Sequence, residues 1–320
     1  MRAKKITILG GSGFLGSHLV THLAAQGHRI TVLTRYREDS RHLLVIPQAT
    51  IVQTNVHNER ELAAQLAGAD VVVNLIGILN EKGRKGLGFD KVHVQLVNKI
   101  LAACNTHGIR KFVHMSALKA DAGDGPSYYL QSKGRAEDAI RGNKNPDLAW
   151  SILQPSVIFG PDDSFINKFA DLLKLPSPVF PLPRANARFA PVYVGDVIKA
   201  ISRCITDTGT DNKVYQLCGP QVYSLREILQ LVCDHTGLRR NIVGVPDSLA
   251  RMQAAFMDFV PGKPFSTDNF KSLTVHSICD KDGFSRLDIK PEALTAVLPK
   301  YLGTVDVRRR YSKMREHAGR

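Results

Sequence analysis

The sequence predicts an α/β fold with a doubly wound parallel sheet and helices on both faces. Short apolar runs alternate with amphipathic segments along the first half of the chain, which is typical of repeated strand–helix units. The first apolar run breaks directly into glycines and is followed by a helix-like segment, within residues 6–16. Residues 71–75 form an almost continuous apolar run, which indicates a strand buried on both faces, as in parallel sheets.

The glycine cluster ITILGGSGFLG, at residues 6–16, is typical of the dinucleotide-binding turn of a Rossmann fold. One glycine permits a turn that a Cβ would block, another lets backbone N–H groups approach a pyrophosphate, and a third lets the helix lie near the strand. The phosphates then sit at the positive end of that helix. A glycine-rich turn without a ligand is the alternative. The expected contacts are Gly10, Ser12, Gly13, Phe14, Leu15 and Gly16.

The loop after residues 29–34 indicates which dinucleotide is bound. A site that prefers NAD places Asp or Glu at the end of this strand to bond the ribose 2′-hydroxyl. Here the strand runs into the sequence TRYR, and the first carboxylate is Glu38. Because a guanidinium pairs well with a 2′-phosphate, the sequence predicts NADP(H), with Arg35 as the main anchor and Arg37 as a second. A solvated basic loop is the alternative.

The spacing of apolar residues, together with glycines, prolines and capping residues, predicts the later elements in order. Strands are expected at residues 29–34, 50–54, 71–75, 111–115, 149–153, 190–194, 214–217 and 241–245. Helices are expected at residues 14–26, 59–66, 89–107, 128–142, 165–173, 196–206, 224–236, 249–260 and 291–298. The helix at 196–206 is expected to be capped from Gly195 and Asp196, and Ser224 with Glu227 forms a capping box. Residues 176–191 are rich in proline, which predicts an irregular wrap over the active-site mouth.

The length of 320 residues suits one large α/β domain or a nucleotide domain with a smaller companion. We expect residues 1–160 to form the nucleotide-binding core, with further core elements from 190–218. Residues 161–320 then form a smaller substrate or interaction region that ends in a basic tail. The net charge of +14 attracts anions in general, among them nucleotides, acidic lipid and acidic partners. No reading motif for nucleic acid is visible, so that partner is not expected.

The five cysteines form no C-x-x-C pair, which predicts a reduced intracellular protein without structural zinc or another metal site. The N-terminal apolar run is cut by glycines and lacks a small-residue cleavage site, so a strand is expected there and not a signal peptide. No apolar run is long enough to span a bilayer. The sequence therefore predicts a cytoplasmic protein, with a peripheral position on the inner face of the cell membrane as the alternative.

Tyr129 and Lys133 lie four residues apart on a predicted helix, so they share one face. A phenol has a pKa of about 10, and a neighbouring ammonium is expected to lower it toward the range for proton transfer. The same lysine can bond the nicotinamide ribose, and Ser116 at the adjacent strand end could hold the substrate oxygen. The pattern predicts hydride transfer in which Tyr129 moves the proton. A surface Tyr–Lys pair is the alternative.

The motifs GGSGFLG, SAL, YLQSK, QPSVIFGP and PVYVGDV stand in the order seen in extended and atypical short-chain dehydrogenase/reductases, and nearly the whole chain resembles them. More narrowly, PSVIFGPDDSFINKF and AVLPKYL resemble the complex I alpha-subcomplex subunit 9 group, which includes an NADPH-binding accessory subunit and bacterial relatives. Together with the residues after each strand, the resemblance implies further cofactor contacts. These are Asn55, Val56, Leu75, Gly77, Met115, Tyr129, Lys133, Pro155, Ser156, Val157 and Ile158.

The chain departs from the family pattern at three positions. Many extended members carry a catalytic Ser or Thr where Ala117 follows Ser116. Asn55 replaces a common acid, and Gln154 replaces a common arginine. The first departure bears on catalysis, because Ser116 is then a candidate for contacting the cofactor in place of the substrate. The other two are expected to retune binding.

The leading hypothesis is an NADP(H)-binding reductase that acts on a quinone or other carbonyl and is linked to respiratory complex I or quinone metabolism. One alternative is a non-catalytic NADPH-binding structural or assembly subunit, and another is a sugar-nucleotide epimerase or dehydratase. The apolar stripe at residues 249–260 and the basic tail could contact a respiratory assembly or an anionic membrane surface. The favoured expectation for that stripe is a helix packed over the substrate pocket.

Overall fold

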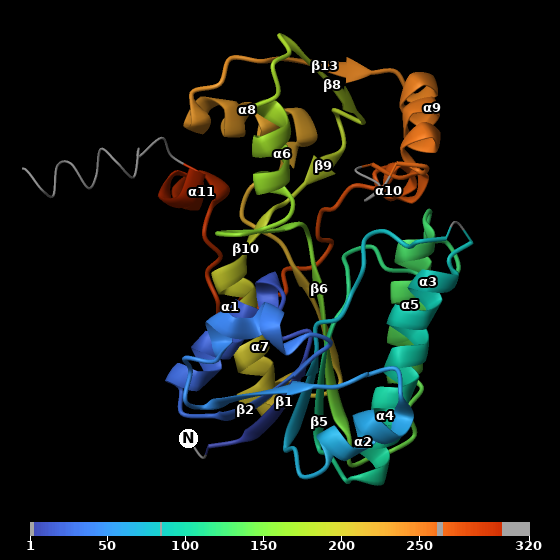
Figure 1. Ribbon diagram of the computed structural model, residues 1–320, viewed down its shortest axis with the longest axis vertical. Coiled ribbons are helices and arrows are strands. Elements are labelled where there is room, and N and C mark those ends of the chain that lie inside the picture. The colour runs from blue at the N-terminus through green and yellow to red at the C-terminus, as the bar shows by residue number, and fades with distance from the viewer. Residues whose placement is uncertain (1–2, 84, 261–264, 303–320) are drawn as a thin grey trace, which may run out of the picture.

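The protein is an α/β molecule with a sheet-based end and a smaller mixed end, as the computed structural model shows in Figure 1. The structure describes residues 3–83, 85–260 and 265–302. The basic tail from residue 303 onward lies outside the described residues, so the expectation that it contacts a membrane or a partner has no structural account.

The predicted doubly wound sheet is confirmed, and all seven of its strands run parallel. Their order is β11-β6-β5-β4-β1-β2-β3. The strands are β1 (Lys5–Leu9), β2 (Arg29–Thr34), β3 (Ala49–Gln53), β4 (Val71–Asn74), β5 (Lys111–Met115), β6 (Ala149–Pro155) and β11 (Lys213–Leu217). The chain order reverses between β1 and β4, and ligands of such sheets bind at that point, outside the carboxyl ends of the strands.

Helices cover both faces of this sheet because successive strand residues point to opposite sides. Val71 and Val73 enter one apolar cluster, whereas Val72 enters the other. One face carries α1 (Phe14–Ala25) and α7 (Val194–Thr206). The other carries α2 (Glu59–Leu66), α4 (Leu96–Thr106) and α5 (Tyr128–Arg141). A 3₁₀ segment that the sequence did not predict, η1 (Arg37–Leu43), follows β2.

The smaller end has its own apolar cluster, in which Phe159, Leu229 and Leu298 are fully buried. Three helices build it: α6 (Ile166–Leu173), α8 (Leu225–Thr236) and α11 (Leu294–Leu302). Short strand pairs join them: β7 (Ile158–Phe159) with β10 (Val192–Tyr193), β8 (Val179–Pro183) with β13 (Asn241–Val245), and β9 (Arg188–Phe189) with β12 (Tyr223–Ser224). Two further helices, α9 (Asp247–Met257) and α10 (Thr267–Ser272), lie toward the α5 side. The remaining short 3₁₀ turns are η3 (Thr208–Thr210) and η4 (Ser285–Leu287).

Three local predictions need correction. Residues 176–191 are irregular only in part, because β8 pairs in parallel with β13 and β9 pairs with β12. The helix predicted at 89–107 is confirmed, but it is not α-helical throughout: it runs as α3 (Leu87–Phe89), a π-helical segment η2 (Asp90–Gln95) and α4. Helix α7 begins at Val194 and not at residue 196; Asp196 lies in its first turn and bonds Lys199 and the Glu292 N–H.

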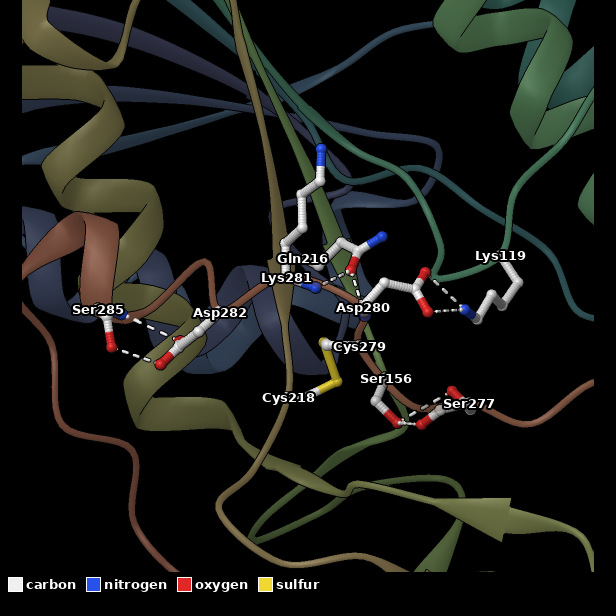
Figure 2. Close-up of a disulfide and its surroundings, with 10 residues drawn as sticks. All are labelled: Lys119, Ser156, Gln216, Cys218, Ser277, Cys279, Asp280, Lys281, Asp282 and Ser285. Carbon is white, nitrogen blue, oxygen red and sulfur yellow. Dashed lines mark hydrogen bonds and ion pairs between the residues drawn. A yellow bond between two sulfur atoms is a disulfide. The ribbon is translucent and has the colours of Figure 1, made fainter.

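The prediction that all cysteines are reduced is wrong for Cys218 and Cys279. These two form a disulfide with Cα atoms 6.0 Å apart, as Figure 2 shows. The chain brings them together because the segment after α10 runs along the outer edge of β11. Asp280 and Lys281 donate backbone N–H bonds to Gln216 Oε1 there, at 2.8 and 3.0 Å. Cysteine usage therefore no longer argues for a reducing compartment.

The sheet-based end also contains elements from the second half of the chain. β11 and α7 lie far along the chain yet complete the sheet-based end. The predicted boundary near residue 160, between the nucleotide-binding core and the smaller region, stays a prediction.

Every helix in the described part of the chain is too short or too polar to cross a membrane.

Candidate functional site

The turn between β1 and α1 contains glycines of two kinds. Gly10 has φ +80°, and a Cβ on Gly16 would lie 2.3 Å from the Gly10 carbonyl oxygen. These two glycines are required by the turn itself. A Cβ on Gly13 would meet only that same oxygen, at an ordinary 3.5 Å. The fold therefore does not require glycine at position 13, whereas close approach of a phosphate to the backbone does.

The N-terminus of α1 is open to an anion. Gly13 is its N-cap, and among the described residues no side chain caps it. The first turn carries no carboxylate, and Phe14 and Leu15 are half-buried. Its free N–H groups and the helix dipole both favour a negative ligand. The Ser12 hydroxyl lies 3.3 Å from the Thr34 hydroxyl, which ties this turn to the end of β2.

Positive charge gathers beside the ends of β2 and β3. Arg35 and Arg37 are both exposed, and the Arg37 N–H bonds Gln53. The loop that follows has two carboxylates, Glu38 and Asp39, and Glu38 is paired with Arg41. The sequence prediction of a basic loop here is therefore matched by the structure, although its ligand is not tested.

His57 lies next to this positive charge, and sequence reasoning missed it. Burial lowers the pKa of His57, and the nearby charges of Lys91, Lys99 and Arg35 lower it further. Lys99 Nζ also donates to the His57 carbonyl oxygen at 2.7 Å. The exposed Asn55 accepts the His57 N–H with its side chain, and Val56 between them is buried. Three cations, Arg35, Lys91 and Lys99, therefore surround a neutral His57 beside the expected adenosine end.

The predicted cofactor residues after β4 and β5 do come together around Lys133. Its Nζ donates to the Met115 carbonyl oxygen at 2.9 Å. A Cβ on Gly77 would lie 3.3 Å from the same Nζ. Leu75, which bonds the end of β1 through its N–H, precedes this glycine. Burial lowers the pKa of Lys133 to about 8, and Glu137 opposes the shift.

Tyr129 shares the buried α5 face with Lys133, but the expected pKa shift is wrong in sign. Burial raises the pKa of Tyr129 to about 12, and the charge of Asp268 raises it as well. The Asp268 carboxylate accepts the backbone N–H groups of Tyr128 and Tyr129, at 2.8 and 3.2 Å. The phenol is therefore neutral at pH 7 and can act as a proton donor.

His93 holds the loop after β4 against α5, and sequence reasoning missed it too. The Ile78 N–H donates to His93 Nε2 at 3.1 Å, and Nδ1 lies 2.8 Å from the Ser132 hydroxyl. That hydroxyl donates to the Tyr129 carbonyl oxygen, so the ring proton sits on Nδ1. Burial and then the Lys133 charge lower the pKa of His93 to about 2, so the ring is neutral.

The π-helical segment η2 places His93 in this position. π-helical turns inside α-helices occur frequently at functional sites. The ring of His93 is 5.7 Å from that of Tyr129, and Phe89 also contacts both rings. A pattern of apolar residues at helical spacing carries no sign of one extra residue in a turn, so no sequence signal could have located it.

Ser116 has a partner inside the fold. Its hydroxyl donates to the buried carboxylate of Glu137, which also accepts from Gln154 at 2.8 and 3.0 Å and from Arg141 at 2.6 Å. Burial raises the pKa of Glu137, and the Ser116 and Gln154 bonds oppose that effect. The structure directs the Ser116 hydroxyl to Glu137, so a catalytic role for Ser116 stays a prediction.

The loop Pro155–Ile158 ends β6 at the same edge of the sheet. The Ser156 hydroxyl donates to the Ser277 carbonyl oxygen at 2.8 Å and lies 2.9 Å from its hydroxyl (Figure 2). Val157 and Ile158 are half-buried, and Pro155 pairs with the end of β11. Their predicted cofactor contacts are not tested, but all lie at the carboxyl end of the sheet.

A cavity of about 190 Å³ adjoins the start of α5. Residues from the loop after β4, from α5, from α9 and from α10 line it, among them Glu81, Tyr128, Thr267, Asp268 and Lys271. Asp268 therefore reaches both this cavity and Tyr129. Sequence analysis had assigned no site residue to α10, because its contribution depends on a contact between residues about 140 positions apart.

The comparisons with known proteins agree with this geometry. A family model described as NAD(P)H-binding matches residues 10–165. The chain is 29% identical over 313 residues to NADH dehydrogenase [ubiquinone] 1 alpha subcomplex subunit 9, mitochondrial, from Arabidopsis thaliana, covering 92% of this chain and 76% of the relative. It is 31% identical over 202 residues to the ceramide reductase of Caulobacter vibrioides, covering 63% and 61% of the two chains.

Solved structures agree at the level of the fold. The UDP-glucose 4-epimerase of Thermotoga maritima superposes with a TM-score of 0.74 at 18% identity, covering 93% of this chain and 97% of that one. The nucleotide turn, the Tyr–Lys pair on α5 and these relatives support one assignment: the chain is similar to the NAD(P)-binding atypical short-chain dehydrogenase/reductases, with distant homologues among complex I alpha subcomplex subunits 9 and bacterial reductases.

Proposed function

We propose that the protein is an NADP(H)-dependent reductase of a carbonyl or quinone substrate. The observation that carries this proposal is the half-buried, neutral Tyr129 on the same helix face as Lys133, at the carboxyl ends of β4 and β5. A phenol that keeps its proton at pH 7 suits the reducing direction, in which the substrate oxygen gains a proton. The ceramide reductase relative is named for a reductive reaction, which favours the same direction.

The residues divide the work as follows. The dinucleotide, when bound, supplies a hydride to the carbonyl carbon. Tyr129 donates its phenolic proton to the carbonyl oxygen, and the Lys133 ammonium stabilises the phenolate left behind. His93 fixes the loop after β4 against α5, which holds Gly77 over Lys133. Arg35, Lys91 and Lys99 offer positive charge for a 2′-phosphate, which supports NADPH over NADH.

A single-turnover assay tests this function. NADPH oxidation is followed with a series of ketones and quinones, and Tyr129→Phe is expected to slow it by about 10²–10⁴-fold. Tyr128→Phe is the matched control, because it removes a neighbouring hydroxyl from the same helix turn and leaves Tyr129 in place. Equal rates for the wild type and Tyr129→Phe would exclude Tyr129 as the proton donor.

A second candidate is a non-catalytic NADPH-binding subunit. It is favoured by the Ser116 hydroxyl, which is engaged by Glu137, together with Ala117 at the position where many relatives carry a catalytic hydroxyl. The nucleotide would then stabilise the fold by mass action. Tight NADPH that does not exchange, with no turnover of any carbonyl or quinone, would support this function, and rapid exchange with turnover would contradict it.

A further inference from the structure

Helix α9 carries its large apolar side chains on the outside. Leu249, Met252, Phe256 and Phe259, just beyond its end, are between 50% and 75% exposed. The side of α9 that faces the protein is made of small residues, with Ala250 and Ala254 fully buried. The expectation that this stripe packs over the substrate pocket is therefore wrong. A soluble helix normally has the opposite arrangement.

Other exposed apolar side chains lie on segments that contact α9 and α10. Leu79 and Leu87, from the loop after β4 and from α3, are 57% and 73% exposed. Asn269 of α10 donates to the Leu79 carbonyl oxygen at 3.1 Å. Thr267 of α10 bonds Asp258 at the end of α9. These segments adjoin one another along one side of the molecule in Figure 1, and we call their six exposed apolar residues the apolar rim. The apolar rim comprises Leu79, Leu87, Leu249, Met252, Phe256 and Phe259.

Around the apolar rim, the carboxylates are bonded within the fold, whereas the cations are exposed to solvent. Each carboxylate of these segments has an internal partner: Glu81 accepts the Gly86 and Gly88 N–H groups, Asp258 bonds Thr267, and Asp268 accepts the start of α5. Asp247, at the start of α9, pairs with Arg184. The cations are instead exposed, and they are Lys82, Lys85, Arg251 and Lys271.

We propose that the apolar rim docks on an anionic bilayer, with the outer face of α9 at the boundary between headgroups and acyl chains. Protruding Leu, Met and Phe side chains beside exposed Lys and Arg are the combination that such a boundary binds. Exposed apolar groups gathered on one side mark an interaction surface. The exposed cations favour an anionic partner, and the carboxylates that would repel it are bonded within the fold.

The docked position also bears on the reaction, and this part rests on the proposed function. The cavity of about 190 Å³ is lined from the same segments, by Glu81, Asp258 and Lys271 among others. Phe89 lines the cavity too and lies 6.1 Å, ring to ring, from Tyr129. The cavity thus lies between the segments of the apolar rim and Phe89, which separates it from Tyr129, and we place the entry of a bilayer-dissolved carbonyl or quinone at this cavity.

Co-sedimentation of the full chain with vesicles tests the docking. Vesicles of phosphatidylcholine alone and of phosphatidylcholine with phosphatidylglycerol are compared. The wild type is expected to bind the second kind. Because each large apolar side chain adds to the area buried in the bilayer, the double variant Met252→Ser/Phe256→Ser should bind at least about tenfold more weakly. Leu44→Ser/Val45→Ser is the matched control, since both residues are exposed apolar side chains near η1.

Charge-reversal variants and a measurement of NADPH affinity complete the experiment. Lys85→Glu/Arg251→Glu should weaken binding to the anionic vesicles, whereas Lys213→Glu, on β11, should not. NADPH affinity is measured for every variant and should be unchanged, so a failure of docking is separate from a failure of the proposed function. The proposal is overturned if Met252→Ser/Phe256→Ser binds anionic vesicles as the wild type does, if no vesicle is bound, or if those substitutions only abolish self-association.

Discussion

Two helices of the sheet-based end begin in opposite ways. At the start of α1, among the described residues, no side chain caps the first turn, and no carboxylate lies in it. At the start of α5, the Ser127 hydroxyl accepts the Leu130 N–H and the Asp268 carboxylate accepts two more N–H groups. Both termini present the same dipole. The difference teaches that α1 leaves its N–H groups for an external anion, whereas α5 uses an internal one to hold Tyr129.

The glycines of the first turn offer the largest expected effect. Gly16→Ala should lower the free energy of unfolding by about 3 kcal/mol, because its Cβ would overlap the Gly10 carbonyl oxygen and the backbone must move. Gly13→Ala should lower the free energy of unfolding by no more than about 1 kcal/mol, since alanine is a poorer N-cap residue than glycine but its Cβ meets no clash. It should nevertheless weaken NADPH binding at least about tenfold. Thermal unfolding and titration calorimetry separate the two effects.

If Gly13→Ala binds NADPH as tightly as the wild type, the open start of α1 is not a phosphate site. If it unfolds as readily as Gly16→Ala, the distinction between the two glycines is wrong.

Arg35 sharpens the comparison at the adenosine end. Arg35→Ala should weaken NADPH binding by about 10–100-fold, since a hydrogen bond to a charged group contributes about 1.5–3 kcal/mol. NADH binding should stay within about twofold, because NADH has no 2′-phosphate. Arg37→Ala, two residues further from the strand, should have a smaller effect on NADPH. Equal losses for both dinucleotides would show that Arg35 does not recognise the 2′-phosphate. Calorimetric titration of each variant with NADPH and NADH measures these ratios.

Asp268 tests the comparison at the start of α5. Asp268→Asn should cost about 1 kcal/mol of unfolding free energy, because the cap of α5 loses its charge but keeps an oxygen acceptor. The pKa of Tyr129 should fall from about 12, since one cause of its rise is removed while burial remains. Spectroscopic titration of tyrosinate, with Tyr129→Phe as the reference, measures that change. An unchanged titration would mean that Asp268 holds the backbone alone.

A pH dependence is expected from Lys133. Burial holds its pKa at about 8, against 10.5 in the unfolded chain. Between these values the unfolded state binds more protons, so this residue contributes stability that increases as pH rises from about 8 to 10.5. The free-enzyme value of kcat/KM should instead fall through about pH 8, because the ammonium is lost. A pH profile that is unchanged in Lys133→Met would contradict this.

The sequence by itself determined the parts that depend on near neighbours along the chain. The β1–α1 glycine turn, the basic loop after β2 and the Tyr129–Lys133 pair are each contained in fewer than a dozen residues. Strand and helix periods predicted the parallel sheet because backbone geometry repeats over the same short distances. The family resemblance rested on the same local motifs and is confirmed.

Only the tertiary structure decided the contacts between distant segments. His93 reaches Ser132 across 39 positions, Asp268 reaches α5 across about 140, and Cys218 meets Cys279 across 61. None of these pairs shares a local period, and burial together with the charge of Asp268 reversed the expected pKa shift of Tyr129. The outward face of α9 belongs here as well, because a helical stripe of apolar residues fixes which residues lie together but not whether that side meets the core or the solvent.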